Sequence, residues 1–190
     1  MNKGEEMGYK GNMKQVGMVL GLFCLVFGAA VGASAAEKLE AKAELIDAQG
    51  KPVGAALLEG TPKGVKINLR VSGLPPGRHA LHIHETGKCD PPDFKSTGGH
   101  FNPTHKKHGW QNPEGHHAGD LPDFVVDESG RGGLDALIEG VTLSGQGENS
   151  LFHPGGTSVV IHASADDNKT DPSGNSGARI ACGVITASAQ

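Results

Sequence analysis

Strict alternation of apolar and polar side chains over residues 65–71 is the feature that most limits how this chain can fold. The odd-numbered positions are Val, Ile, Leu and Val, and the positions between them are polar. Successive side chains of a β-strand point to opposite faces, so this period of two predicts a strand with one buried face. Similar short runs, bounded by Gly, Pro, Asp or Ser, occupy residues 41–46, 52–58, 79–84, 123–126, 133–138, 158–163 and 180–186. Eight short strands, in a chain with 30 glycines and 11 prolines, predict an all-β antiparallel sandwich or barrel.

Two polar segments, residues 85–121 and 163–177, interrupt the strand pattern. Loops longer than about 12 to 15 residues in a compact domain are usually functional or disordered. The first segment is rich in Gly and Pro and contains five of the ten histidines together with Cys89. We therefore expect it to carry a functional site.

The first 36 residues are predicted to be a targeting segment. Three lysines precede an uncharged run over residues 16–36, which ends in small residues at the positions that a signal peptidase recognises. We expect a secretory signal cleaved near Ala35 or Ala36, and an exported protein of the periplasm, the cell envelope or the extracellular space. The alternative is an uncleaved anchor, since about 20 apolar residues can span a bilayer. Met7 and Met13 are alternative starts.

Residues 37–190 are predicted to form a single domain with its own hydrophobic core. Of the 17 basic and 21 acidic residues in the chain, three lysines and two glutamates precede this domain, which leaves 14 against 19 and a net charge of −5. An acidic balance of this size gives no reason to expect a nucleic acid as a partner.

Two cysteines, Cys89 and Cys182, lie in the predicted domain. An even pair in an exported chain is expected to be oxidised, and two free buried thiols are the alternative. A disulfide here would enclose a loop of roughly 90 residues, for which the chain-entropy model gives about 4 to 5 kcal/mol.

The histidines of residues 79–84 divide by strand parity. Leu81 and Ile83 are expected to face the core, so His82 and His84 share the outer face. Two imidazoles at positions i and i+2 of one strand face can bind a single metal ion. His79 has the parity of the core residues, and we expect it to point inward and hydrogen-bond to the backbone.

Further ligand-type residues follow, and imidazole suits zinc and copper whereas a carboxylate completes a tetrahedral zinc site. They are His100, His108, His117, Asp120 and His162. With His82 and His84 they make seven candidate ligands, more than one ion needs. Two ions are therefore expected.

Five sequence segments occur in the order in which they are found in one enzyme family. They are GRHALHIHETG, GGHFNP, HAGDLPDFVV, VVIHASADD and GARIACGVI. Over about residues 41–188 the chain resembles the copper/zinc superoxide dismutases. The resemblance implies an eight-stranded antiparallel Greek-key β-barrel with two long functional loops.

The resemblance also implies the ligands of two metal ions that share one histidine. Copper would be held by His82, His84, His100 and His162. Zinc would be held by His100, His108, His117 and Asp120. His100 would bridge the two ions as an imidazolate.

Four other residues have roles that the resemblance implies. Asp166 would link a copper histidine to a zinc histidine, and such outer partners orient metal ligands. Cys89 would pair with Cys182. Arg179 would lie beside the copper, where a guanidinium attracts and orients a small anion.

The activity that the resemblance implies is the dismutation of superoxide. One superoxide would reduce copper and leave as oxygen, and a second would reoxidise it and leave, with two protons, as hydrogen peroxide. Zinc does not change oxidation state, so its role would be structural. The alternative function is a secreted, non-catalytic copper/zinc-binding or metal-buffering protein, which a missing copper ligand or arginine would favour; neither is missing.

Several features fall outside the family pattern. His105, His116 and His153 match no ligand position and are expected to be solvated loop residues. Ser173 stands roughly where the family commonly has threonine, a difference that bears on anion guidance rather than on the metal sites. The pattern does not choose between a monomer and a homodimer, and a membrane is a partner only through an uncleaved N-terminal segment.

Overall fold

The computed structural model describes residues 39–188, so the predicted targeting segment lies outside the described residues. Within them the chain forms ten strands and one short 3-10 turn, η1 (Lys95–Thr97). The strands are β1 (Glu40–Asp47), β2 (Pro52–Thr61), β3 (Gly64–Ser72), β4 (Gly77–His79), β5 (Leu81–His84), β6 (Phe124–Val126), β7 (Arg131–Glu139), β8 (Ser158–His162), β9 (Arg179–Val184) and β10 (Thr186–Ala187). Between residues 39 and 188 no helix is long and apolar enough to cross a membrane.

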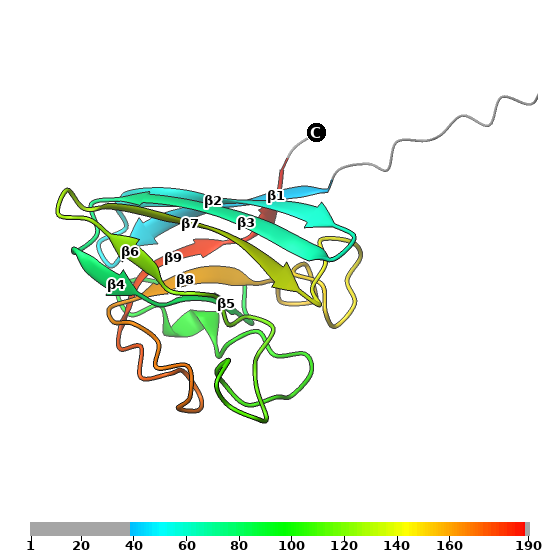
Figure 1. The fold of residues 1–190 in the computed structure, drawn as a ribbon. Coiled ribbons are helices and arrows are strands. Elements are labelled where there is room, and N and C mark those ends of the chain that lie inside the picture. The colour runs from blue at the N-terminus through cyan, green and yellow to red at the C-terminus, as the bar shows by residue number, and fades with distance from the viewer. Residues whose placement is uncertain (1–38, 189–190) are drawn as a thin grey trace, which may run out of the picture. The chain divides into compact units, whose positions relative to one another are not determined.

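The strands form one antiparallel sheet that curls into a nearly closed barrel (Figure 1). The sheet order is β4-β6-β7-β3-β2-β1-β9-β8-β5, and β10 pairs with β1. β4 and β5 therefore stand at opposite ends of this order, although only Ala80 separates them in the chain. This short connection brings the two ends of the sheet together, and the all-β antiparallel prediction is confirmed.

Two of the eight predicted strands are divided in the structure. Residues 79–84 split at Ala80, because β4 pairs with β6 whereas β5 pairs with β8. Residues 180–186 split between β9, which pairs with β8, and β10, which pairs with β1. A strand that changes its partner at a barrel corner must interrupt its own ladder, which explains why eight sequence runs become ten segments.

The core follows the predicted parity. Ile67 and Leu69 of β3 and Leu81 and Ile83 of β5 are all buried in the main hydrophobic cluster. His79 is also buried, and its two ring nitrogens lie 2.7 Å from the carbonyl oxygen of His162 and 2.8 Å from that of Pro75. The prediction that His79 serves the fold through backbone hydrogen bonds is confirmed.

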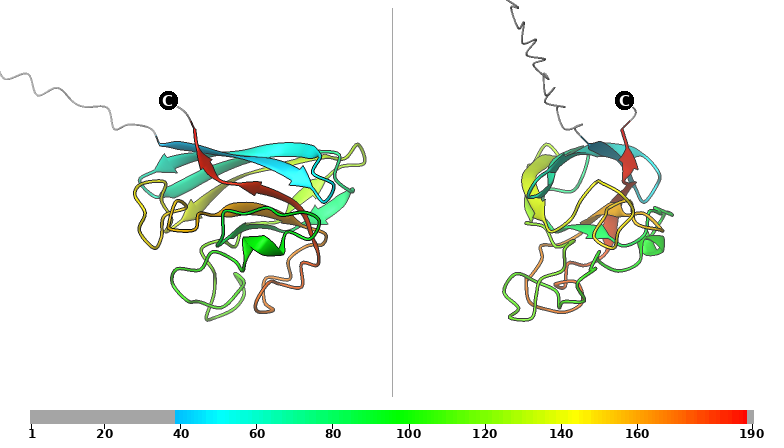
Figure 2. Two further views of the ribbon diagram at one scale, coloured as in Figure 1. Left: turned by 180° about the vertical axis from the view of Figure 1, so that it is seen from behind. Right: turned by 90° about the vertical axis from the view of Figure 1, so that its right-hand side faces the viewer.

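The outer face of β5 is covered by the two long loops. Residues 85–121 and 163–177 both extend from the β5 and β8 side of the barrel, as the green and orange segments in Figure 2 show. They contact each other where the backbone N–H of His108 donates to Asp171 at 2.8 Å and that of Gln111 donates to the carbonyl of Asn168. His82 and His84 are therefore buried rather than solvated, although they face away from the hydrophobic core.

A disulfide connects the first long loop to the barrel. Cys89 is bonded to Cys182 of β9, with a Cα–Cα distance of 5.7 Å, which confirms the predicted pair. Beside it, Phe94 is completely buried against Val160 and Cys182 in a small second cluster. The loop is thus attached to the barrel by one covalent bond and one aromatic side chain.

Replacing both Cys89 and Cys182 with serine is expected to lower the free energy of unfolding by about 2 to 5 kcal/mol, because the cross-link encloses a long loop. Denaturant unfolding of the wild-type protein, oxidised and reduced, and of the double variant measures this. The reduced wild-type protein should match the variant. Equal stability of all three samples would contradict the prediction.

Candidate metal centre

Four buried imidazoles form the first group of potential metal ligands. His82 and His84 lie on β5, His162 ends the adjacent strand β8, and the backbone of His100 pairs with that of His84. Their ligand atoms all lie within 4.8 Å of one another. These are the four residues that the sequence resemblance assigns to copper.

Two of these imidazoles each leave one buried nitrogen without a partner. Nε2 of His82 lies 2.8 Å from Asp166 Oδ2, and Nδ1 of His100 lies 2.8 Å from Asp120 Oδ1. The other nitrogens, His82 Nδ1 and His100 Nε2, are buried and make no hydrogen bond. Burying an unpaired polar atom is costly, so these two atoms fit a role as metal ligands.

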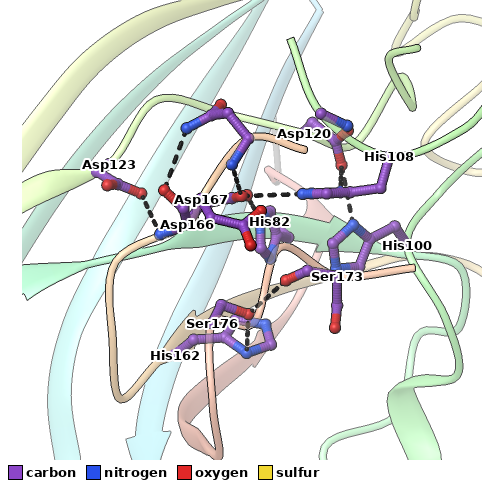
Figure 3. Close-up of polar contacts among 12 residues, drawn as sticks. His82, His100, His108, Asp120, Asp123, His162, Asp166, Asp167, Ser173 and Ser176 are labelled. Atoms are coloured by element: carbon purple, nitrogen blue, oxygen red, sulfur yellow. Dashed lines mark hydrogen bonds and ion pairs between the residues drawn. The ribbon is translucent and has the colours of Figure 1, made fainter. Parts of the chain in front are cut away.

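His84 and His162 are oriented in the same way from their outer sides. Nδ1 of His84 lies 3.0 Å from the carbonyl oxygen of Gly98. Nδ1 of His162 lies 3.1 Å from Ser176 Oγ, a contact that Figure 3 shows. Their Nε2 atoms face each other at 3.4 Å. A metal-bound histidine commonly uses its second nitrogen in such a bond, which fixes the orientation of the ring.

Burial keeps three of these imidazoles, those of His84, His100 and His162, neutral at physiological pH. It lowers the pKa of His84 well below its usual value, that of His100 to about 4 and that of His162 to about 3. A neutral imidazole retains a lone pair, which metal binding requires. These three rings are therefore protonated only in acid.

A second group converges on a single carboxylate oxygen, Asp120 Oδ1. The Nδ1 atoms of His100, His108 and His117 lie 2.8, 3.0 and 3.3 Å from it. A tetrahedral zinc ion with bonds of about 2.0–2.1 Å places its ligand atoms roughly 3.3 Å apart. The donor types and their spacing therefore fit zinc.

The hydrogen bonds to Asp120 and Asp166 keep both carboxyl groups ionised. Burial raises the pKa of each carboxyl group, but hydrogen bonds from histidines outweigh burial and lower it overall. For His108 burial lowers the pKa, yet hydrogen bonds with both carboxylates raise it to about 9. Two ionised carboxylates around one imidazole favour a cation at this position.

His82 lies closer to the second group than the sequence suggests. Its ring centroid is 3.9 Å from that of His100, and its ligand atoms fall within 4.8 Å of those of His100, His108 and Asp120. His117 does not belong to this tight set, although its Nδ1 is 3.3 Å from Nδ1 of His100. His117 nevertheless contacts the carboxylate of this group, since its Nδ1 is 3.3 Å from Asp120 Oδ1.

Asp166 connects the two groups. One of its oxygens lies 2.8 Å from His82 Nε2, and the other lies 2.9 Å from His108 Nε2. It belongs to the second long loop, which also contributes Ser176 beside His162. The two contacts join Asp166 to histidines that are 84 and 58 positions away in the sequence.

Arg179 lies at the side of the first group. Its guanidinium donates to the carbonyls of Phe94 and Gly98 and to Thr97 Oγ1, each at 2.8 Å. Together with His84, His100 and His162 it lines a cavity of about 220 Å³, to which Ser173 also contributes. A fixed positive charge therefore stands beside a small cavity that reaches the imidazoles.

Of the three histidines that were expected to be solvated loop residues, two differ from expectation. His105 is exposed, as predicted. His116 is partly buried and stacks on Trp110 with a centroid distance of 3.5 Å, and His153 is partly buried against Phe101 at 5.2 Å. The expectation of a solvated side chain is wrong for these two, because each ring packs on an aromatic neighbour that sequence spacing does not reveal.

Thr97, Ser176 and Asp123 contact site residues but carried no signal in the sequence. The first two hold the outer nitrogens of His84 and His162, and Asp123 Oδ1 accepts the backbone N–H of Asp166 at 3.1 Å. They belong to no ligand pattern, so only their tertiary contacts identify them.

Comparison with known sequences decides the family. The sequence model described as copper/zinc superoxide dismutase (SODC) matches residues 53–185. This chain belongs to the copper/zinc superoxide dismutase family. It is 52% identical over 153 residues to superoxide dismutase [Cu-Zn] 1 of Aquifex aeolicus, covering 80% of this chain and 90% of the relative. It is 43% identical over 138 residues to superoxide dismutase [Cu-Zn] of Caulobacter vibrioides, covering 72% and 79%.

Solved structures of this family agree with the fold. A superoxide dismutase-like protein from Bacillus subtilis has a TM-score of 0.72 at 40% identity, covering 75% of this chain and 96% of the other. The Cu/Zn superoxide dismutase from Brucella abortus has a TM-score of 0.61 at 27% identity, covering 77% and 99%. Copper and zinc are the cofactors of the family, and the two His and Asp groups are able to hold them.

Gly174→Ala tests whether the link through Asp166 matters. Gly174 has a φ of +63°, and a Cβ there would collide with the Asp166 carboxylate and with Nε2 of His108. We expect the variant to bind zinc about 10- to 100-fold more weakly, as is typical when a partner of a metal ligand is displaced.

Gly145→Ala is the matched control. Gly145 has a φ of +64°, and a Cβ there would meet nothing within 4 Å. Chelator competition on both variants separates backbone strain from displacement of Asp166. Equal loss of zinc affinity in the two variants would contradict the prediction.

Proposed function

We propose that this chain is an exported superoxide dismutase that uses copper for catalysis and zinc for structure. One observation carries the proposal: two groups of metal-ligand atoms share His100, and a cavity beside the first group is lined by Arg179. Family membership supports the same activity, since the Aquifex and Caulobacter relatives are both named superoxide dismutase [Cu-Zn].

We assign the two ions by donor chemistry and hydrogen bonding. Copper takes the four-imidazole group of His82, His84, His100 and His162. Zinc takes His100, His108, His117 and Asp120. When bound, copper supplies the electron transfer that oxidises one superoxide to oxygen and reduces a second to hydrogen peroxide, whereas zinc, without redox chemistry, holds the loop.

Arg179 attracts and orients the substrate. Its three hydrogen bonds to the loop at Phe94, Thr97 and Gly98 fix the guanidinium beside the cavity. Superoxide is a small anion, so a fixed positive charge at the cavity wall raises its local concentration and positions it against the imidazoles.

His100 is suited to a role in proton transfer. Its Nδ1 is directed at Asp120 in the second group, which leaves Nε2 for the first. If Nδ1 serves the second group, an Nε2 atom that is not a ligand would carry the single proton of a neutral imidazole. One of the two protons that peroxide formation consumes therefore has a carrier within the site.

The leader and the disulfide both support export. We propose that residues 1–36 direct the chain out of the cytoplasm, by cleavage near Ala35 or Ala36 or as an anchor. The Cys89–Cys182 bond supports an oxidising compartment, since such bonds are rare in the cytosol.

Superoxide decay tests the activity directly. The domain loaded with copper and zinc is expected to accelerate the decay, to lose this activity on selective removal of copper, and to regain it when copper is restored. Stoichiometric binding of both metals without dismutation would overturn the proposal in favour of a metal-buffering protein.

Arg179→Ile tests anion guidance. The variant is expected to retain its copper content but to react with superoxide at least about tenfold more slowly, and with a weaker dependence on ionic strength, because the attracting charge is gone. Arg131→Ile, which changes an exposed arginine of β7, is the control and should react at the wild-type rate. An unchanged rate in the Arg179 variant would remove the role assigned to this residue.

A further inference from the structure

Asp123 is a largely buried carboxylate that belongs to neither metal group. It immediately precedes β6, and its side chain is 5% exposed. Oδ1 accepts the backbone N–H of Asp166 at 3.1 Å, a contact visible in Figure 3. Oδ2 accepts Nε of Arg78 at 3.0 Å. Both oxygens are therefore engaged, one with the metal-linking residue and the other with the barrel.

Asp123 contacts the backbone of Asp166 and not its carboxylate, so it acts on the position of the Asp166 main chain. The Asp166 carboxylate spans two rings, at 2.8 Å from His82 Nε2 and 2.9 Å from His108 Nε2. A short side chain reaches both rings only if its own backbone is held at the correct distance from them. The hydrogen bond from the Asp166 N–H to Asp123 fixes this backbone position.

Arg78 anchors Asp123 to the closing strands of the barrel. Arg78 lies on β4 opposite Val125 of β6, so the β4–β6 ladder brings its guanidinium next to Asp123. A continuous path of hydrogen bonds then runs from β4 through Asp123 and Asp166 to His82 and His108.

Simple stabilisation is a poor account of this arrangement. The side chain of Arg78 is 62% exposed, and an ion pair with an exposed partner contributes little to stability. Burying a carboxylate has a cost that its hydrogen bonds must offset. The position of Asp123 is better explained by the residue that it holds.

We propose that Asp123 is a positioning residue, which with Arg78 fixes Asp166 so that its carboxylate holds His82 and His108 at a set separation. The inference rests on the metal assignment proposed above. It predicts that a substitution of Asp123 or Arg78 alters zinc binding and the geometry of bound copper, although Asp123 contacts neither His82 nor His108.

Asp123→Ala is the principal test. The variant is expected to bind zinc about tenfold more weakly in chelator competition, the lower end of the range for partners of metal ligands. Its Cu(II) absorption and electron paramagnetic resonance spectra should shift, because the His82 ring is no longer held. Asp123→Asn keeps an oxygen that accepts the Asp166 N–H, and it should restore most of the wild-type zinc affinity and spectrum.

Asp135→Ala is the matched control. Asp135 also accepts a hydrogen bond from an arginine, Arg70, at 2.9 Å, but on the exposed face of β3 and β7. This variant should keep the wild-type zinc affinity and copper spectra. A loss of zinc affinity in Asp135→Ala equal to that in Asp123→Ala would overturn the proposal, because a general effect of losing an Arg–Asp pair would then explain both.

A second variant covers the case in which Asp123→Ala does not fold. Arg78→Ala changes an exposed side chain and should weaken zinc binding by a smaller factor than expected for Asp123→Ala. Wild-type zinc affinity and copper spectra in Arg78→Ala, or in a folded Asp123→Ala, would overturn the positioning role. The wild-type protein is assayed for superoxide decay in the same series. A failure of the proposed activity is therefore seen separately from a failure of the positioning role of Asp123.

Discussion

A buried imidazole must use both of its ring nitrogens, and the architecture of this protein follows from that constraint. Each histidine of the first group has one nitrogen hydrogen-bonded to a carboxylate, a hydroxyl or a backbone carbonyl. The nitrogens of His82 and His100 that are left unpartnered are the ones that a metal ion would satisfy. The outer bonds therefore decide which atoms are available for binding, before any ion arrives.

The barrel and the loops contribute different parts of the site. The barrel places His82, His84 and His162 on two neighbouring strands, where the ladder between β5 and β8 fixes their spacing. The loops bring the remaining donors and cover the site, which removes it from water. Because loops alone are poor scaffolds, they are secured by the Cys89–Cys182 bond, the buried Phe94 ring and the contacts between the loops themselves.

Three aspartates, Asp120, Asp166 and Asp123, support the imidazoles of the site. Asp120 supplies the oxygen on which three imidazoles converge, and Asp166 contacts both His82 and His108. Asp123 in turn holds the backbone of Asp166 and is itself held by Arg78. Carboxylates are suited to this sequence of roles, since each offers two oxygens and can accept hydrogen bonds from two directions.

The strand pattern by itself determined the all-β class and the division between His79, which serves the fold, and His82 with His84. Parity is a local property, so seven residues of sequence suffice to read it. The identity of the ligand-type residues was likewise readable, and their grouping into two metal sites came from the resemblance to a known family. Only the tertiary structure decided that residues 79–84 break at Ala80, that His116 and His153 pack on aromatic rings, and that Asp123 holds Asp166. The physical reason is separation along the chain: Asp166 meets His82 across 84 residues and Asp123 across 43, and no periodicity in the sequence encodes contacts of that length.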